Sequence, residues 1–311
     1  MKVLVTGGAG FIGSHVAEAC IEAGHDVLVV DDLSTGKREN VPDGAALYEV
    51  DIRDGDALDG VFEAEAPEVI SHQAARANVR ESMLMPLLYA DVNVMGSLTL
   101  LEAARKHGTR KIVYASTGGA VYGEPEYLPV DEAHPINPLD PYGASKHHVE
   151  HYLYIYGKHF GLDYTILRYP NVYGPRQDPY GEAGVVAIFV AQLLSGGQPI
   201  INGTGEQQRD FCYVGDIARA NVLAFERGNG EILNIGSGVG TSVNEVFERL
   251  VDICDSDSEE RHAPAKQGEV FRTYLDAAKA REVLGWESRT SLQEGLAATV
   301  EEFRRASRTR A

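Results

Sequence analysis

The sequence is poor in the features that mark secreted and membrane proteins. Three cysteines, Cys20, Cys212 and Cys254, occur among 311 residues. They are too few and too scattered for a disulfide framework, so we expect a cytoplasmic protein. No apolar run reaches the length of a membrane span, and the first residues lead into a strand without a signal-peptide pattern. We therefore expect no contact with a membrane.

Basic residues are scarce as well. The chain has 28 lysines and arginines against 46 acidic residues, which is a formal net charge of −18. Such acidity argues against nucleic acid as a partner, because nucleic acid is itself an anion. His147, His148 and His151 lie close together, but no suitable pattern of carboxylates or cysteines completes a ligand shell around them. We predict no metal site.

Short apolar strands alternate with helical patterns through about residue 167. The strands are expected at residues 2–6, 26–30, 46–50, 68–71, 111–116 and 164–168. This order predicts an α/β fold, a doubly wound parallel Rossmann sheet, with a smaller mixed α/β substrate-binding lobe. We assign residues 1–170 and about 215–240 to the Rossmann domain, and residues 171–214 and 241–311 to the lobe. The two parts interleave because residues 221–235 are expected to return to the sheet.

A glycine-rich turn follows the first strand. Residues 7–13 read Gly-Gly-Ala-Gly-Phe-Ile-Gly and lead into a helical pattern, and the next strand ends in Asp31 and Asp32. Strand, glycine turn, helix and acid in this order predict a dinucleotide site, in which amides at the helix N-terminus face the pyrophosphate. Asp31 would accept hydrogen bonds from the adenosine ribose and repel a 2′-phosphate. We therefore favour NAD over NADP, although Lys37 and Arg38 could in principle receive that phosphate.

Tyr142 and Lys146 form the second informative pair. Asp140 is a suitable N-cap and Pro141 suits the first helical position, so a helix is expected to begin here and place both side chains on one face. An ammonium close to a phenol favours the phenolate. The pair could thus supply a base that takes a proton from an alcohol. Taken alone, the same spacing is also typical of ordinary surface helices.

With both motifs present, the chain resembles the extended short-chain dehydrogenase/reductase family. Within that family the similarity is to the nucleotide-sugar branch and to UDP-galactose (UDP-glucose) 4-epimerases. The resemblance covers essentially the whole chain. The segments that carry it are residues 7–13, Asp31, 51–52, 72–75, Asn93, 116–123, 142–146, 168–171 and 209–214.

The resemblance implies NAD-dependent epimerisation at C4 of a UDP-hexose through a transient 4-keto sugar. Tyr142 would take the proton of the 4-hydroxyl, Lys146 would bind the nicotinamide ribose, and NAD would take up and return the hydride. The residues that the resemblance assigns to the cofactor are Gly7, Gly10, Phe11, Ile12, Gly13, Asp31, Asp32, Asp51, Ile52, Gln73, Ala74, Ala75, Asn93, Ser116, Tyr142, Lys146 and Tyr169.

A second set of residues is assigned by the resemblance to the UDP-sugar. Asn171 and Arg209 match residues that contact the diphosphate, which suits the paired hydrogen bonds of a guanidinium. Lys266 competes with Arg272 for a second cationic role there. The full set is Thr117, Gly118, Tyr142, Asn171, Val185, Val186, Asn202, Arg209 and Arg272, in which the two valines match the uracil site.

The loop at Gly118 and Gly119 departs from the family pattern. Counting back from residues 121–123 puts the usual catalytic Ser or Thr on Gly118, which has no hydroxyl. We expect Thr117 to supply that hydroxyl, with Ser116 as the second candidate and unaided action of Tyr142 as the third. The glycines also lack the acidic residues that dehydratases and decarboxylases of the family place there. This lack favours simple epimerisation.

Several alternatives stay open at this stage. Thr273 matches the residue that limits space near a sugar N-acetyl group and is smaller than tyrosine, so N-acetylated UDP-hexosamines are a hypothesis. Asp178 lies where some uronate epimerases have an arginine, which disfavours UDP-glucuronate. Other readings are a different NAD-dependent nucleotide-sugar dehydratase or oxidoreductase, a UDP-uronate epimerase, and a catalytically silent NAD-binding sensor or scaffold. The helices at residues 93–106 and after Tyr142 form a dimer interface in the family, so a homodimer is expected.

Overall fold

A seven-stranded parallel sheet forms the larger part of the molecule in the computed structural model, which describes residues 1–180, 184–265 and 270–309. The strand order is β10-β6-β5-β4-β1-β2-β3. Reading along the chain, the strands are β1 (Lys2–Thr6), β2 (Asp26–Asp31), β3 (Ala45–Glu49), β4 (Val69–His72), β5 (Lys111–Thr117), β6 (Asp163–Tyr169) and β10 (Glu231–Asn234). The predicted strands therefore exist, with ends that differ by one residue or so, and the predicted fold class is confirmed.

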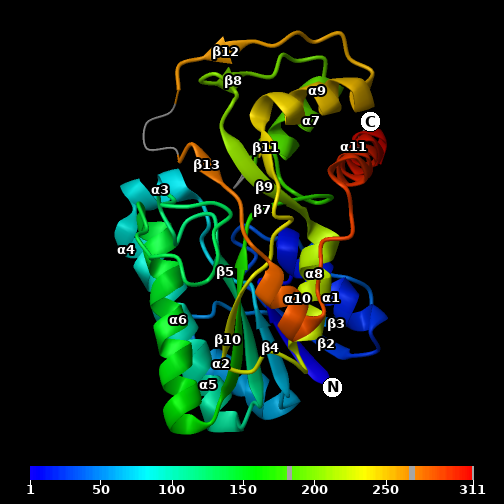
Figure 1. The fold of residues 1–311 in the computed structure, drawn as a ribbon. Helices are drawn as coiled ribbons and strands as arrows, with labels where there is room; N and C mark the ends of the chain where they lie inside the picture. The colour runs from blue at the N-terminus through cyan, green and yellow to red at the C-terminus, as the bar shows by residue number, and fades with distance from the viewer. Residues whose placement is uncertain (181–183, 266–269, 310–311) are drawn as a thin grey trace.

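Helices cover both faces of this sheet (Figure 1). Successive side chains of a strand point to opposite faces, so Val3 and Val5 belong to one hydrophobic cluster and Leu4 to another. The first cluster is completed by α1 (Phe11–Glu22), α8 (Val214–Ala224) and α10 (Ala278–Leu284), and the second by α2 (Gly55–Glu65), α5 (Ser97–His107) and α6 (Pro141–Phe160). Short helical segments precede α5 and α6 or follow β2: η1 (Arg38–Asn40), α3 (Val79–Leu84), α4 (Pro86–Tyr89) and the π-helical η2 (Ala90–Gly96).

The smaller part lies beyond the carboxyl ends of the large sheet (Figure 1). Its sheet has the order β11-β9-β13, with β7 also paired to β9, and β8 pairs with β12. The strands are β7 (Asn171–Tyr173), β8 (Ile201–Asn202), β9 (Gln208–Tyr213), β11 (Gly240–Ser242), β12 (His262–Ala263) and β13 (Arg272–Thr273). They pack with α7 (Val185–Leu194), α9 (Val243–Cys254) and α11 (Leu292–Thr309) around Phe189, Phe247 and Leu296.

The chain passes between the two parts several times. Residues 214–234 return to the large sheet, where β10 adds parallel to β6. Ala280, Leu284 and Trp286 pack in the core of the large sheet, although our predicted boundary counts everything after residue 241 with the smaller lobe. The domain limits stay a prediction, and the path of the chain makes the two parts structurally interdependent. Within the described residues, no helix combines the length and apolar character needed to cross a membrane.

Candidate active site

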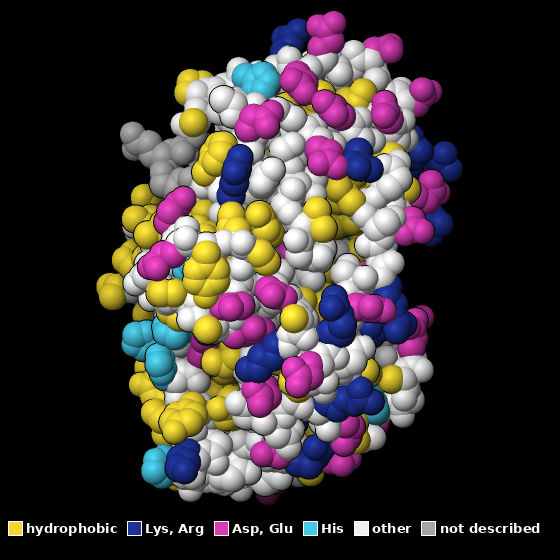
Figure 2. All heavy atoms as spheres, in the orientation of Figure 1, with side chains coloured by type: hydrophobic (Ala, Val, Ile, Leu, Met, Phe, Trp, Pro, Cys, Tyr) yellow, Lys and Arg dark blue, Asp and Glu magenta, His cyan; other side chains and the backbone are white. Residues whose placement is uncertain are grey.

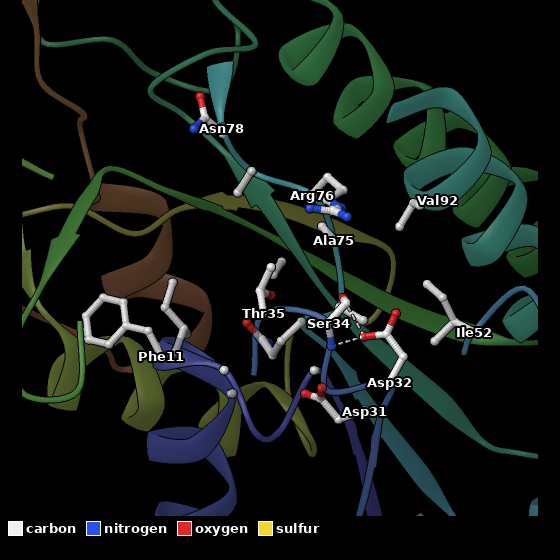
Figure 3. A pocket seen from close by; sticks show the side chains of 18 of the residues that line it. Phe11, Asp31, Asp32, Ser34, Thr35, Ile52, Ala75, Arg76, Asn78 and Val92 are labelled. Carbon is white, nitrogen blue, oxygen red and sulfur yellow. Dashed lines mark hydrogen bonds between the residues drawn. The ribbon is translucent and has the colours of Figure 1, made fainter. Parts of the chain in front are cut away.

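A cavity of about 740 Å³ opens at the carboxyl ends of the parallel strands. This edge is where doubly wound sheets bind their ligands. Figure 3 shows Phe11 and Ile52 on opposite sides of the cavity, with Asp31 between them and Asp32 bonded to Ser34. The residues predicted for the cofactor that line it are Gly7, Gly10, Phe11, Ile12, Gly13, Asp31, Asp32, Asp51, Ile52, Gln73, Ala74, Ala75, Ser116, Tyr142, Lys146 and Tyr169.

The glycine turn is shaped by close contact between its own backbone atoms. A Cβ on Gly13 would lie 2.1 Å from the carbonyl oxygen of Gly7, so no other residue fits. Gly7 has a positive φ of 67°, and a Cβ there would lie 2.7 Å from the amide nitrogen of Ala74. The first turn of α1 therefore packs closely against the end of β1, and the N-terminus of a helix is a site that favours a pyrophosphate.

The carboxylate of Asp31, the last residue of β2, is held in place by two backbone amides. Its two carboxylate oxygens accept hydrogen bonds from the backbone amides of Ala9 and Leu33, both at 2.9 Å. Burial raises the pKa of Asp31, and these two hydrogen bonds oppose that effect. The nearby basic residues are already paired with acids: Lys37 lies 3.8 Å from Asp178, and Arg38 lies 2.6 Å from Glu49. The cavity wall thus offers a carboxylate for ribose hydroxyls and fits NAD.

Asn93 is the one predicted cofactor residue that lies behind the cavity wall. It is buried, its Oδ1 accepts from the amide of Arg76 at 2.8 Å, and its Nδ2 donates to the carbonyl of Arg76 and to Ser145 Oγ. Arg76 lines the cavity and Ser145 belongs to α6. Asn93 therefore connects the cavity wall, through Arg76, to the helix that bears Tyr142.

Tyr142 and Lys146 reach the cavity from the first turns of α6. The helix begins as predicted, because Asp140 accepts a hydrogen bond from the amide of Gly143 at 2.7 Å and Pro141 is its first residue. Lys146 is 3% exposed, with its Nζ 4.4 Å from the centre of the Tyr114 ring. Burial, assisted by the charge of Lys146, lowers the pKa of His72 to about 3, so that histidine is neutral. Tyr142 and Lys146 thus lie one turn apart on α6 and line the same cavity.

Behind this pair lies a buried network of charged and polar groups. Glu150 accepts hydrogen bonds from Arg168 Nε and Nη2, at 3.0 and 2.6 Å, and from Ser116 Oγ at 2.6 Å. His147 Nδ1 lies 3.0 Å from the same carboxylate. Burial acts to raise the pKa of Glu150, but the hydrogen bonds from His147 and Arg168 outweigh it and bring the value to about 2. Glu150 is therefore ionised, and Ser116 must be the donor in their hydrogen bond.

Thr117 lies at the Gly119 end of the loop, whereas Ser116 lines the cofactor cavity. A Cβ built on Gly119 would lie 3.8 Å from Thr117 Oγ1 and 4.0 Å from Asn171 Oδ1, so these polar groups border the same space. Gly118 lies against Leu275, because a Cβ on Gly118 would be 2.5 Å from Leu275 Cδ1. Leu275 is itself buried and its amide is bonded to Asp210 at 3.1 Å. Leucine thus fills the place that a side chain at position 118 would need.

The other residues predicted for the substrate lie on the smaller sheet and its helices. Asn171 and Thr273 border a narrow void next to the loop of Gly119, and Thr273 is the register partner of Arg209. Arg209 Nη1 donates to the carbonyl of Gln208 at 2.8 Å, and Arg272 lies over the ring of Phe271. Val185 is half-buried at the start of α7, Val186 is in the lobe core, and Asn202 ends β8. Lys266 lies outside the described residues. The substrate roles stay predictions.

Some cavity residues have no motif in the sequence. Arg176, Gln177 and Asp178 line the cavity from the segment that follows β7. Arg76 and Glu81 also line it, from the region between β4 and α4. The only local signal is the turn at Gly174 and Pro175, which predicts a bend and no ligand.

Residues 3–236 match the sequence model of the NAD dependent epimerase/dehydratase family. The chain belongs to this family. The predicted resemblance and the prediction of NAD as cofactor are confirmed, and so is the prediction of an enzyme of the UDP-glucose 4-epimerase-like isomerase type.

Individual members of the family are similar over their full length. The UDP-glucose 4-epimerase of Mycolicibacterium smegmatis is 44% identical over 313 residues, covering 99% of this chain and 100% of the relative. The crystal structure of UDP-glucose 4-epimerase from Thermotoga maritima with UDP-glucose has a TM-score of 0.97 and 49% identity, covering 99% and 100% of the two chains. The crystal structure of UDP-glucose 4-epimerase from Thermus thermophilus in complex with NAD has a TM-score of 0.93 and 45% identity, covering 98% and 99%.

Glu150→Gln tests the buried network of this family member. Removing the charge leaves Arg168 buried without its counter-ion, so we expect the free energy of unfolding at pH 7 to fall by about 3 kcal/mol. Because the pKa of Glu150 is lowered from 4.5 to about 2 on folding, its stabilisation is complete above pH 4.5 and is lost as the pH falls toward 2. The variant should therefore lose less stability than the original protein between pH 5 and pH 3.

Urea unfolding at pH 7, 5 and 3 measures both effects. Glu63→Gln, an exposed change on α2, is the matched control and should follow the original protein. A loss below about 1 kcal/mol at pH 7 would contradict the stabilising role of the network.

Proposed function

We propose that the protein interconverts UDP-glucose and UDP-galactose by NAD-dependent epimerisation at C4, through a transient 4-keto sugar. The observation that carries this proposal is that Tyr142 and Lys146 line the same cavity as the glycine turn and Asp31. A base for an alcohol thus shares one cavity with the dinucleotide site. The similar Thermotoga maritima enzyme, which binds UDP-glucose, supports the choice of sugar nucleotide.

The residues divide the work as follows. Tyr142 takes the proton from the sugar 4-hydroxyl and returns it after the sugar has turned. Lys146 favours the phenolate of Tyr142 through its charge and binds the nicotinamide ribose. NAD, held by the glycine turn and Asp31, would supply the hydride acceptor for C4 and the donor that returns the hydride to the opposite face. Asn171, Arg209 and Arg272 hold the diphosphate, and Val185, Val186 and Asn202 belong to the uridine side.

Epimerisation is favoured over dehydration by the loop after β5. Gly118 and Gly119 carry no acid or base that could remove water from the keto sugar. Asp178 speaks against a uronate substrate, because it supplies no cation where some uronate epimerases have an arginine. Thr273 is smaller than a tyrosine, which supports N-acetylated UDP-hexosamines as additional substrates.

The decisive experiment incubates the protein with UDP-glucose, UDP-galactose, their N-acetylated forms and the UDP-uronic acids, and separates the products by chromatography. We expect UDP-glucose and UDP-galactose to interconvert without net release of NADH, and UDP-N-acetylglucosamine to be converted as well. Tyr142→Phe should lower the rate by about 100-fold or more.

Three results would contradict the proposal. Net release of NADH would indicate an oxidoreductase, and loss of water would indicate a dehydratase. Inert behaviour toward all the sugars with NAD still bound would indicate a sensor or scaffold. If the N-acetylated sugars are not converted while UDP-glucose and UDP-galactose are, only the N-acetylated UDP-hexosamines are excluded as substrates.

A finer proposal is that Thr117 supplies the hydroxyl between the sugar and Tyr142. The proton of Ser116 is committed to Glu150, whereas Thr117 Oγ1 borders the space shared with Asn171. We expect Thr117→Val, which keeps the side-chain volume, to lower the epimerase rate by about 10-fold or more, and Ser116→Ala to lower it only a few-fold. Rates with UDP-galactose decide. If neither variant loses more than a few-fold, Tyr142 works unaided.

The assembly is also a proposal, namely a homodimer formed through the helices beside α6. Several exposed apolar side chains lie there, among them Leu84 at 83%, Leu87 at 84% and Tyr154 at 59% exposure. Figure 2 shows hydrophobic side chains gathered along the left edge of the molecule, where α4 and α6 lie. Such a patch is typical of an interface. We also propose a cytoplasmic location, because three scattered cysteines are too few for a disulfide framework.

Light scattering tests the dimer. The double change Leu84→Asp and Leu87→Asp should halve the mass in solution, because it puts two charges into the apolar contact. Val239→Asp, at a side chain that is 60% exposed on a different part of the surface, is the control and should leave the mass unchanged. A monomeric mass for the unchanged protein would contradict the proposal.

A further inference from the structure

The segment at residues 174–178 connects the smaller lobe with the cofactor half of the molecule. It follows β7, which pairs with β9 of the small sheet, and its side chains line the cofactor cavity. We call it the 174–178 loop. The roles of the glycine turn and of the Tyr142 helix do not account for the contacts that hold this segment of the smaller lobe at the cofactor cavity.

The outer side of the 174–178 loop is fastened to α1, the helix whose N-terminus faces the cavity. The guanidinium of Arg176 meets the carboxylate of Glu18 with two hydrogen bonds, the Nη1–Oε1 one at 3.2 Å. His15 Nε2 lies 3.0 Å from the carbonyl of Pro175, and its Nδ1 lies 2.7 Å from Arg176 Nη2. A neutral His15 that donates from Nε2 to Pro175 and accepts at Nδ1 from Arg176 satisfies the two shorter contacts, and Arg176 Nε also lies 3.3 Å from Nε2. These contacts join residues about 160 positions apart.

The backbone of Arg176 shows that these contacts hold the loop in an otherwise unfavourable conformation. Arg176 has a positive φ of 67°, a backbone conformation that residues with a Cβ rarely adopt. Such a conformation persists where the surrounding contacts impose it. The paired hydrogen bonds to Glu18 and the contact with His15 act in this way. His15 in turn packs edge-on against Phe11, whose ring is part of the cavity wall.

The inner side of the 174–178 loop faces the cavity. Gln177 is 8% exposed and lines the cavity, and its Nε2 donates to the carbonyl of Val172 at 3.2 Å. With the amide flipped, Oε1 would face the carbonyl oxygen of Val172, and two acceptors would oppose each other. Nε2 is therefore the donor to Val172, and Oε1 is left to accept a hydrogen bond from another group. Among residues 1–180, 184–265 and 270–309, Oε1 has no hydrogen-bond partner. A buried acceptor without a partner requires an O–H or N–H donor, and NAD carries ribose hydroxyls and a carboxamide.

A second contact joins the 174–178 loop to the segment after β2. Asp178 lies 3.8 Å from Lys37, which follows β2 and also lines the cavity. The 174–178 loop thus reaches both α1 and the segment after β2, the two elements that border the dinucleotide site.

We propose that the 174–178 loop retains NAD in the cavity, and that Arg176, fastened to Glu18 and His15, is the residue that positions it. A reaction that returns its hydride in every cycle requires a cofactor that stays bound, so retention has a function here. This role depends on bound NAD and does not depend on which sugar is converted. Arg176 acts through the loop and is a positioning residue.

The test measures release of NAD from the purified holoprotein after rapid dilution, with released NAD followed by chromatography. Arg176→Met keeps most of the side-chain length and removes both hydrogen bonds to Glu18, and we expect release about 10-fold faster. Glu18→Gln, at a partly exposed site, should accelerate release about three-fold or more. The double variant should resemble Arg176→Met, because both changes break one interaction. Gln177→Leu should also accelerate release, because it removes the buried acceptor.

Glu22→Gln is the matched control, since Glu22 is exposed on the same helix and the change removes the same charge. It should leave NAD release unchanged. Thermal unfolding followed by circular dichroism checks that each variant is folded. If Arg176→Met does not fold, Glu18→Gln decides, because its side chain is 44% exposed.

The proposal would be overturned if both Arg176→Met and Glu18→Gln release NAD within two-fold of the original rate. It would also be overturned if Glu22→Gln accelerates release as much as they do. Excess NAD should restore epimerisation to the loop variants, whereas Tyr142→Phe should stay inactive. A protein that releases NAD faster in these variants but converts no UDP-sugar would support the retention role and refute the proposed function.

Discussion

The buried ion pair between Glu150 and Arg168 is the interaction on which the rest of the site depends. Arg168 lies in β6 beside Ser116 of β5, and Glu150 comes from α6 to cover both. Two charges taken out of water are tolerated only with close geometry and further hydrogen bonds, and here Ser116 and His147 complete the shell of the carboxylate. The orientation of α6 on the sheet is thereby set, and with it the position of Tyr142 and Lys146 at the cavity.

The same network assigns different roles to two neighbouring hydroxyls. Ser116 donates into the protein, toward an ionised carboxylate, while Thr117 lies on the side of Asn171. Gly118 leaves room for Leu275, which the smaller lobe inserts and Asp210 holds by its amide. The loop after β5 is therefore shaped from both sides, by the large sheet and by the smaller lobe. A hydroxyl at position 118 would require Leu275 to move.

Much of the fold and of the cofactor site could be predicted from local sequence. The glycine turn, Asp31 and the helix that begins at Asp140 are built from neighbouring residues, so spacing and capping chemistry reveal them. The roles of Asn93 and Gly118 could not be predicted in this way. Asn93 joins Arg76 to Ser145, and Gly118 meets a leucine that lies far along the chain. Neither contact leaves a pattern in the residues nearby.

The sequence by itself determined the fold class, the dinucleotide site and the Tyr142–Lys146 pair, because each rests on periodicity or on spacings within one turn or one helix. Only the tertiary structure decided which hydroxyl is engaged with Glu150, that Leu275 fills the space at Gly118, and that residues 174–178 lie over the cofactor cavity. These features join residues from different strands and from both lobes, such as His15 with Pro175. Their physical basis is packing and hydrogen bonding between distant segments, which exist only once the chain has folded.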